Sequence, residues 1–135
     1  MNDALKRPIA MLAELMEGPM VIELELPWPP SVNRYYRHFA GRTLLSRAGH
    51  EYRKHVLAKL ASKDHPCFAG AVTLAAEFYP PDSRKRDLDN LLKATLDALQ
   101  HAGLFEDDGQ IEHLDIRRKE PHRPDGLVTV KVTGL

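Results

Sequence analysis

The chain has 135 residues, of which 43% are hydrophobic and 28% charged, and this is the size and composition of one globular domain. Its single cysteine, Cys67, excludes an internal disulfide and is typical of a reducing compartment. Lys plus Arg and Asp plus Glu number 19 each, and no uncharged apolar run approaches the ~18 residues of a membrane span. We therefore expect a cytoplasmic protein that has one core and no membrane partner.

The N-terminal segment, residues 1–19, is expected to form a helical extension. Apolar side chains recur every three to four residues over 4–17, and Gly18 and Pro19 end that pattern. The remainder, residues 20–135, is then the single folded domain.

The domain is expected to begin with a strand and an extended segment. Over 20–26, glutamates alternate with apolar residues, which predicts a strand with one buried face. The proline-rich segment 27–30 ends the strand, and we expect Trp28 to pack in the core. An extended, positively charged stretch is expected over 31–43.

Helices and strands are then expected to alternate. Ser46 is the expected N-cap of a helix that ends near Ser62 and buries Tyr52, Val56 and Leu60. The later elements are expected at 71–79 (strand), 88–101 (helix), 111–119 (strand) and 126–133 (strand). The second helix is expected to bury Leu88, Leu92, Thr95, Leu96, Leu99 and Ala102. The order β-α-β-α-β-β predicts an α/β (α+β) fold, a small mixed sheet flanked by helices.

Charge is segregated along the chain although it sums to zero. Residues 34–54 carry a net +5, residues 97–115 carry −6, and residues 116–135 carry +3. A cationic face beside a focused acidic site suits a protein that binds a polyanion and holds a metal ion against it. The alternative is a solvated surface that is merely patchy.

The densest polar cluster, between a predicted strand and a predicted helix, is Arg84-Lys85-Arg86-Asp87-Leu88-Asp89-Asn90, followed by Lys93. Two carboxylates that are two positions apart, Asp87 and Asp89, can point the same way from an extended or first-turn backbone. They could then share a hard cation such as Mg²⁺, which prefers oxygen ligands. The alternative is that one of them caps the helix and that Asp89 pairs with Lys93.

A second acidic pair, Asp107 and Asp108, follows the predicted helix. An Asp-Gly turn that includes Gly109 would explain this pair without any chemistry. A helix of some 14 residues is roughly 21 Å long, so Asp107 would lie far from Asp87 unless the chain returns. The local pattern therefore leaves open whether the two acidic segments share a site.

Other chemistry has less support. The seven histidines show no helical zinc spacing with a third ligand, and no Gly-rich phosphate loop precedes a helix. Tyr35, Tyr36 and Phe39 lie among arginines and could stack on unpaired bases, although core packing is the stronger expectation.

Three motifs, in this order, resemble the RusA family of Holliday-junction resolvases. They are Leu26-Pro27-Trp28-Pro29-Pro30-Ser31-Val32-Asn33-Arg34-Tyr35-Tyr36-Arg37-His38, then Arg86-Asp87-Leu88-Asp89-Asn90 with Lys93, then Gly103 with Asp107-Asp108. The resemblance runs from about Met20 to Val132. It implies a RusA-like domain over 20–135, whereas residues 1–19 depart from the family pattern, and Met20 could be the biological start.

The resemblance also implies an activity and a site. The activity is that of a homodimeric, Mg²⁺-dependent endonuclease that makes paired symmetric nicks in four-way DNA junctions during recombination and repair. The family's catalytic acids fall on Asp87, Asp89 and Asp108, which would hold the metal, and its catalytic lysine falls on Lys93. We expect the DNA to contact Asn33, Arg34, Arg37, Arg42, Arg84, Lys85 and Arg86.

Two other functions remain open at this point. A Mg²⁺-dependent phosphatase or nucleotide hydrolase would use the same acids without needing the +5 segment. A non-enzymatic DNA-binding module would need the basic face but not the acids. Resolution of a junction requires two symmetric cuts and hence a dimer, and the apolar strand over 127–132 could pair across the two-fold axis unless its edge is covered.

Overall fold

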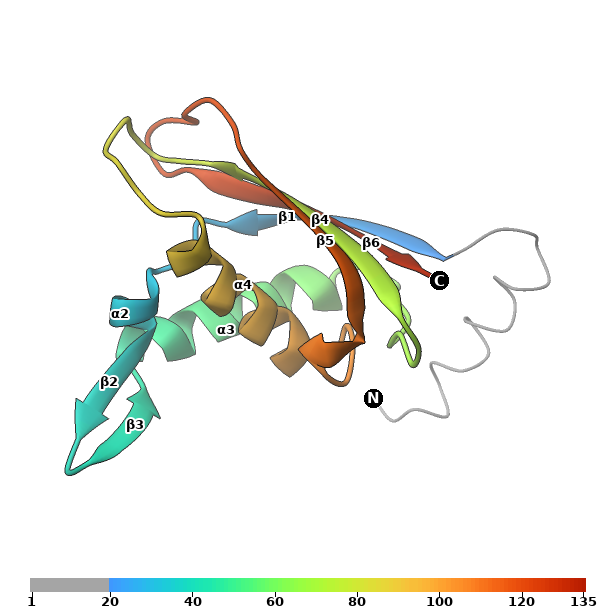
Figure 1. Cartoon of the computed structure of the whole chain (residues 1–135), viewed down its shortest axis with the longest axis horizontal. Helices are drawn as coiled ribbons and strands as arrows, with labels where there is room; N and C mark the ends of the chain where they lie inside the picture. The colour runs from blue at the N-terminus through green and yellow to red at the C-terminus, as the bar shows by residue number, and fades with distance from the viewer. Residues whose placement is uncertain (1–19) are drawn as a thin grey trace.

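The computed structural model describes residues 20–135, and its body is a four-stranded sheet with two helices on one face (Figure 1). The expected helix over 4–17 lies outside the described residues. The strands are β1 (Val21–Pro27), β4 (Val72–Tyr79), β5 (Ile111–Arg118) and β6 (Leu127–Gly134), in the spatial order β1-β6-β4-β5. β4 and β5 are parallel, while β6 is antiparallel to both β1 and β4. The predicted mixed sheet is thus confirmed.

Alternation along the strands places the core on one side of the sheet. In β1, the side chains of Ile22, Leu24 and Leu26 are buried, whereas Glu23 and Glu25 are exposed. The central strands repeat this pattern with Val72, Leu74, Ala76, Phe78, Val128, Val130 and Val132 on the buried face. An antiparallel sheet with one solvated face has this period of two. Trp28 is partly buried against the core, edge-on to Phe78.

The two long helices form where the sequence predicted them. α3 (Arg47–Ala61) begins at Ser46, whose hydroxyl accepts a hydrogen bond from the Gly49 N–H at 3.0 Å. The three expected core residues of α3 are buried. α4 (Asp89–His101) connects the parallel strands β4 and β5 and contacts α3. No helix within residues 20–135 is long and apolar enough to cross a membrane.

The buried face of α4 differs from the predicted face. Thr95, Leu99 and Ala102 are buried as expected, but Leu88, Leu92 and Leu96 are only partly buried. The rest of the buried face consists of Leu91, Ala94 and Ala98. Alanines allow a helix to approach its packing partners closely, so Ala94 and Ala98 face inward beside Leu91 and Leu99, while Leu88, Leu92 and Leu96 lie at the margin of the buried face.

The prediction that residues 31–43 form an extended stretch was correct for the strands over 36–39 and 42–43 but wrong for residues 32–35 and for the turn. The segment forms a short helix, α2 (Val32–Tyr35), and then a hairpin of β2 (Tyr36–Phe39) and β3 (Arg42–Leu45). Ala40 and Gly41 at the turn have φ values of 50° and 74°, and positive φ at both positions matches the twist of paired strands. The turn was missed because alanine replaces the usual Asn or Gly at its first position.

The sequence left open whether the strand over 127–132 has a free edge or a covered one, and the structure shows that it is covered. β6 pairs along its whole length with β1 on one side and with β4 on the other. Its β-branched valines suit a strand enclosed by two neighbours. The edges of the described sheet are instead β1 and β5.

Candidate active site

The start of α4 presents two unengaged carboxylates. Asp87 ends the loop that joins β4 to α4, residues 80–88, and Asp89 is the first residue of the helix. Leu88 is the N-cap, and no side chain caps this helix. Both carboxylates are exposed, and neither bonds to Lys93 or to any other group within residues 20–135. The capping and ion-pair alternatives are therefore absent, and both acids are available to a cation.

The β4–α4 loop is held in place by Arg86. Its guanidinium pairs with the carboxylate of Asp82 at 2.8 Å and lies 5.7 Å from the centre of the Trp28 ring. It also donates to the backbone carbonyl of Arg84 at 3.1 Å, and the Arg118 guanidinium donates to the carbonyl of Arg86 itself. The hydrogen bond from Arg86, aided by the backbone N–H of Arg84, holds the pKa of Asp82 well below its usual value. Arg86 therefore fixes the backbone next to Asp87.

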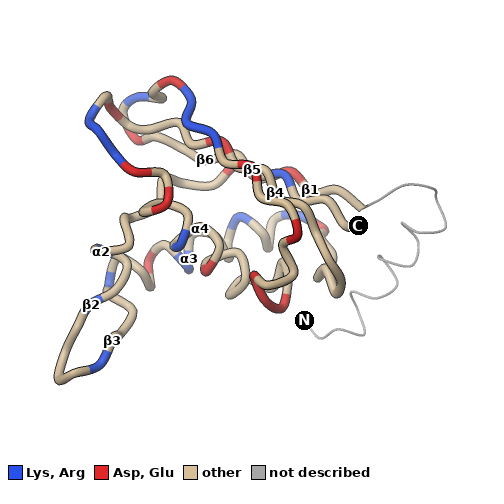
Figure 2. The backbone as a smooth tube through the Cα atoms, in the orientation of Figure 1, with Lys and Arg blue, Asp and Glu red and all other residues tan. Residues whose placement is uncertain are grey.

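A cationic groove of about 660 Å³ opens beside Asp87, between the β4–α4 loop and the segment 28–34. Its polar lining includes Ser31, Arg34, Arg84, Lys85, Arg86, Asp87 and Asn90. The side chains of Arg34 and Lys85 are exposed and make no bond to the rest of the described chain. Figure 2 shows Lys and Arg gathered on this loop and on the neighbouring β5–β6 connection. Exposed cations around a groove are what a phosphate backbone requires.

Asp107 and Asp108 lie beyond the other end of α4, and the structure gives them different roles. Asp108 opens a short 3₁₀ turn, η1 (Asp108–Gln110), and Asp107 is its N-cap. The Asp107 carboxylate accepts from the Gly109 N–H at 3.2 Å, and the Gln110 side chain accepts from the Asp107 N–H at 3.0 Å. Asp107 is thus engaged in the turn. The Asp108 carboxylate is exposed and bonds to no other group in the described part of the chain.

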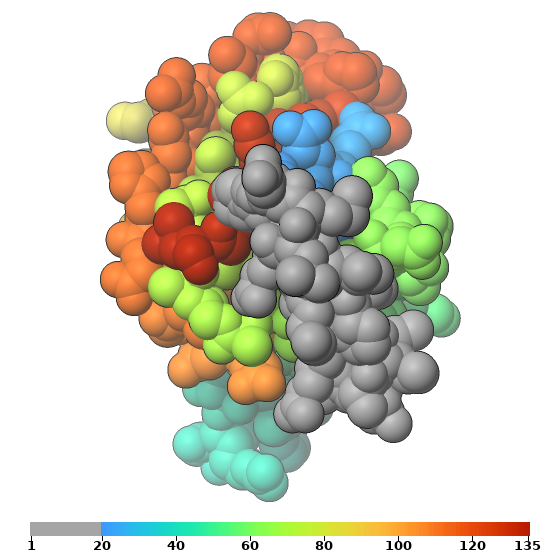
Figure 3. Space-filling view, turned by 90° about the vertical axis from the view of Figure 1, so that its right-hand side faces the viewer, coloured from blue at the N-terminus to red at the C-terminus, as the bar shows by residue number. Residues whose placement is uncertain are grey.

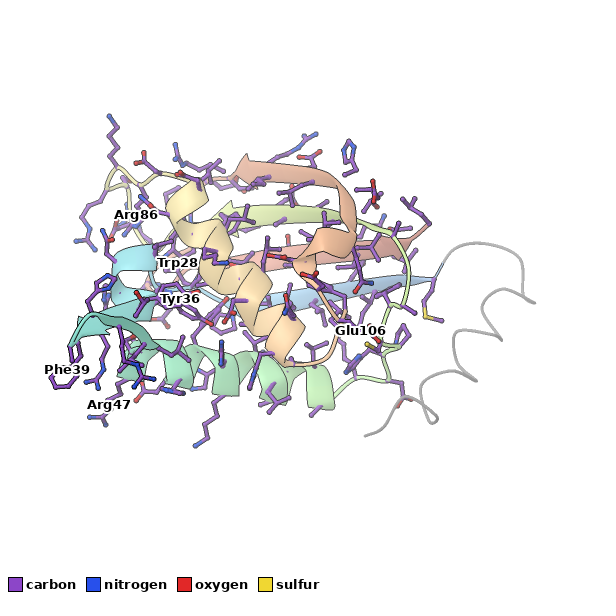
Figure 4. All side chains as sticks on the ribbon, turned by 60° about the horizontal axis from the view of Figure 1, so that its bottom comes forward. Trp28, Tyr36, Phe39, Arg47, Arg86 and Glu106 are labelled. Atoms are coloured by element: carbon purple, nitrogen blue, oxygen red, sulfur yellow. The ribbon has the colours of Figure 1, made fainter. Side chains whose placement is uncertain are left out.

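The two acidic segments are separated by the length of α4. The Asp108 N–H donates to the Gln100 side chain, and Gln100 follows Asp89 by eleven positions, or roughly 16 Å along the helix axis. Figure 4 shows Arg86 and Glu106, which flank the two segments, at opposite ends of α4. No three His, Cys, Asp or Glu side chains of residues 20–135 are arranged to hold a metal ion. One chain therefore brings Asp87 and Asp89 together and leaves Asp108 apart.

A partly buried polar cluster anchors the hairpin near the groove. The Tyr35 hydroxyl donates to the Asp97 carboxylate on α4, and the Arg53 guanidinium on α3 pairs with the same carboxylate at 2.8 Å. Burial and the hydrogen bond to Asp97 raise the pKa of Tyr35 well above its usual value. These three residues span 62 positions of sequence, so no local pattern could have revealed the cluster.

The other expected DNA contacts are exposed, but the three aromatic candidates differ. Asn33, Arg37 and Arg42 lie on α2 and the hairpin, with open side chains. Tyr35 is fully buried and packs edge-on against Tyr36, which is itself partly buried. Phe39 is 65% exposed. Of these three aromatic rings, only that of Phe39 is exposed enough to stack on a base.

A mixed sheet whose crossover helix begins at paired, unengaged carboxylates beside a basic groove offers oxygen ligands to a cation next to a surface that suits a phosphate backbone. The family profile for "Endodeoxyribonuclease RusA" matches residues 27–133. The crossover junction endodeoxyribonucleases RusA of Escherichia coli (strain K12) and of Shigella sonnei (strain Ss046) are each 50% identical over 115 residues, covering 83% of this chain and 93% of the relative. That of Enterobacteria phage 82 is 48% identical over 114 residues. The chain belongs to the RusA family of endodeoxyribonucleases.

Proposed function

We propose that this chain is a Holliday-junction resolvase, an endodeoxyribonuclease that cuts two strands of a four-way DNA junction during recombination and repair. The main support is the pair of exposed, unengaged carboxylates of Asp87 and Asp89 beside a cationic groove. The names of the relatives support the junction as substrate. Such a substrate places the enzyme with the DNA in the cytoplasm, and residues 20–135 form its nuclease domain.

The donor set fits Mg²⁺. Asp87 and Asp89 offer hard oxygen ligands on an exposed surface, and Mg²⁺ is commonly held by one or two carboxylates and several waters. When bound, the ion supplies a water activated for attack on phosphorus and neutralises charge on the phosphate. Lys93 lies one helical turn after Asp89, on the same face of α4, and its ammonium would stabilise the leaving oxygen.

We propose that the third acid, Asp108, comes from a second chain. The length of α4 separates it from Asp87 and Asp89 within one chain, yet its carboxylate is equally unengaged. A four-way junction has pseudo-two-fold symmetry, so a C₂ dimer would present two sites to the two strands to be cut. In that dimer each site would combine Asp87 and Asp89 with Asp108 of the partner subunit. The expected dimer is about 31 kDa, twice the 15.3 kDa of one chain.

The cations divide into two roles in this proposal. Arg34, Arg84 and Lys85 line the groove and would contact phosphates, together with Asn33, Arg37 and Arg42. Arg86 has a side chain that is only 18% exposed and is committed to Asp82, so we infer that it acts by holding the loop.

The deciding experiment offers the protein a synthetic four-way junction, a duplex of the same sequence and free nucleotides, each with and without Mg²⁺. We expect paired symmetric nicks in the junction only, and only with Mg²⁺. Hydrolysis of the nucleotides would instead indicate a phosphatase or nucleotide hydrolase. Binding to the junction without any nick would indicate a DNA-binding module.

A further inference from the structure

The β2–β3 hairpin carries an exposed phenylalanine at its tip. Phe39 is the last residue of β2, directly before the turn, and it is 65% exposed. The hairpin extends away from the sheet and the long helices, and Phe39 lies at its outer end (Figures 1 and 4). The space-filling view likewise shows the hairpin protruding from the molecule (Figure 3). A single exposed apolar residue is ordinary by itself, so the surroundings of this ring decide its meaning.

The surroundings of the ring are cationic. The Arg37 guanidinium lies 5.8 Å from the centre of the Phe39 ring, and Arg42 is the cross-strand partner of Phe39. Residues 36–45 contain no Asp or Glu. An uncharged apolar surface would not match these two guanidinium groups. A nucleic acid offers both negative phosphates and flat base faces, which is the combination that the tip fits.

The base of the hairpin is fixed although its tip is free. The Tyr35 carbonyl accepts hydrogen bonds from both the backbone N–H and the hydroxyl of Ser46, each at 2.9 Å. Gly49 of α3 approaches this carbonyl so closely that a Cβ there would lie 2.5 Å from its oxygen. The Tyr35 side chain is in turn tied to α4 through Asp97. The hairpin therefore presents Phe39 in a set direction at low entropic cost.

We propose that Phe39 stacks on an unstacked base at the branch point of the junction, with Arg37 on the other face of the ring. This proposal rests on the proposed function and adds the residue that distinguishes a junction from a duplex. In a continuous duplex, base faces are covered by their neighbours. At a four-way branch point the stacks are interrupted, so a base face is open to an inserted ring. Arg37 and Arg42 would contact phosphates of a duplex and of a junction alike, whereas the Phe39 ring would gain a contact only at the branch point.

The test measures the affinity of the protein for a four-way junction and for a duplex of the same sequence, in EDTA so that no strand is cut. We expect Phe39→Ala to weaken junction binding roughly tenfold and to leave duplex binding within about twofold. Because the ring is uncharged, the salt dependence should not change. Phe39→Trp should keep the preference, and Phe39→Leu, which retains bulk without a ring, should lose it. Leu57→Ala, at another exposed apolar residue, is the matched control.

A second readout places 2-aminopurine at the branch point. Wild-type protein should change its fluorescence on binding, and Phe39→Ala should not. An unchanged junction-to-duplex ratio in Phe39→Ala, or wild-type behaviour of Phe39→Leu, would overturn the stacking proposal. So would dissociation of a Phe39→Ala dimer in sedimentation, because the ring would then contact protein. A wild-type protein with no preference for junctions would instead contradict the proposed function, so the two failures are distinguishable.

Discussion

The two ends of α4 both carry adjacent acids, but the chain uses them differently. At the N-terminal end, Asp87 and Asp89 neither cap the helix nor pair with a cation. Beyond the C-terminal end, Asp107 caps the η1 turn and Asp108 is left unengaged. A carboxylate that the fold does not use is available for chemistry, and this criterion selects three of the four acids.

The comparison also shows what a single chain lacks. Asp87 lines the cationic groove and Asp89 follows it at the start of α4, whereas the third acid lies roughly 16 Å farther along the helix axis. Charge repulsion alone would favour keeping three carboxylates apart in the absence of a metal ion. In the dimer that we propose, α4 would therefore contribute to two sites, one at each end.

The largest expected effect is loss of cleavage on neutralising the unengaged acids. Asp87→Asn, Asp89→Asn and Asp108→Asn should each abolish junction cleavage, because each removes a proposed metal ligand. Junction binding should be largely kept, since removal of negative charge does not weaken contacts with phosphates. A gel assay of nicked product and a binding titration measure the two quantities.

Asp107 supplies the matched control at the capped end. Asp107→Asn should cut normally, because asparagine caps nearly as well as aspartate. Asp107→Ala should also cut but should lower the free energy of unfolding by about 1 kcal/mol. Inactive Asp107→Asn together with active Asp108→Asn would reverse the assignment of these two acids.

A mixture of two inactive proteins tests whether the ends of α4 meet across a dimer. Protomers with Asp87→Asn and with Asp108→Asn should together form one intact site in each mixed dimer and recover nicking without paired resolution. Wild type mixed with Asp89→Asn is the positive control, because it also leaves one intact site. No recovery by co-refolded mixtures that sediment as dimers would place all three acids in one chain.

A smaller effect is expected on the salt dependence of DNA affinity when exposed arginines are replaced. Joint replacement of Arg34, Arg37 and Arg42 by alanine should reduce the slope of log affinity against log salt by up to about 2.7, near 0.9 per phosphate contact. Lys131→Ala, on the open face of the sheet, is the control and should leave the slope unchanged. A wild-type slope in the triple variant would remove these arginines from the DNA interface.

Arg86 should behave differently from those three. Arg86→Ala leaves the backbone carbonyls of Asp82 and Arg84 without this donor and removes one of the two guanidinium groups at the Asp82 carboxylate, the other being that of Arg84. This loss should cost about 1–3 kcal/mol of unfolding free energy. The slope of log affinity against log salt for this variant should stay close to that of the wild type. Urea unfolding measures the first quantity, and full stability together with a reduced slope would make Arg86 a phosphate contact instead.

The smallest expected effect is a pH dependence in the β4–α4 loop. The hydrogen bond from Arg86 lowers the pKa of Asp82, so the folded state favours the carboxylate. The resulting stabilisation is complete above the ordinary aspartate pKa, near 4, and is lost as the pH falls through the lowered value. Asp82→Asn should remove this dependence. Titration of the Asp82 carboxyl by NMR checks the direction, and an ordinary pKa would contradict it.

Local patterns were sufficient to predict much of the fold. The alternation of β1, the capping of α3 by Ser46 and the crossover helix before β5 all follow from short-range periodicity and turn chemistry. The same patterns singled out Asp87, Asp89 and the second acidic pair, because consecutive polar residues between a strand and a helix are visible without a structure.

Tertiary contacts decided the rest. β6 pairs with β1 across a hundred positions or more and with β4 on its other side, and no local sequence pattern predicts which strands become neighbours. Tyr35, Arg53 and Asp97 meet only because α2, α3 and α4 pack together, and that packing fixes the base of the hairpin that holds Phe39. The position of Asp108 relative to Asp87 likewise depends on the rigid length of α4. The periodicity of apolar residues reports only on structure over a few neighbouring residues. Strand order, burial and the distance between Asp87 and Asp108 are set by how distant segments pack together.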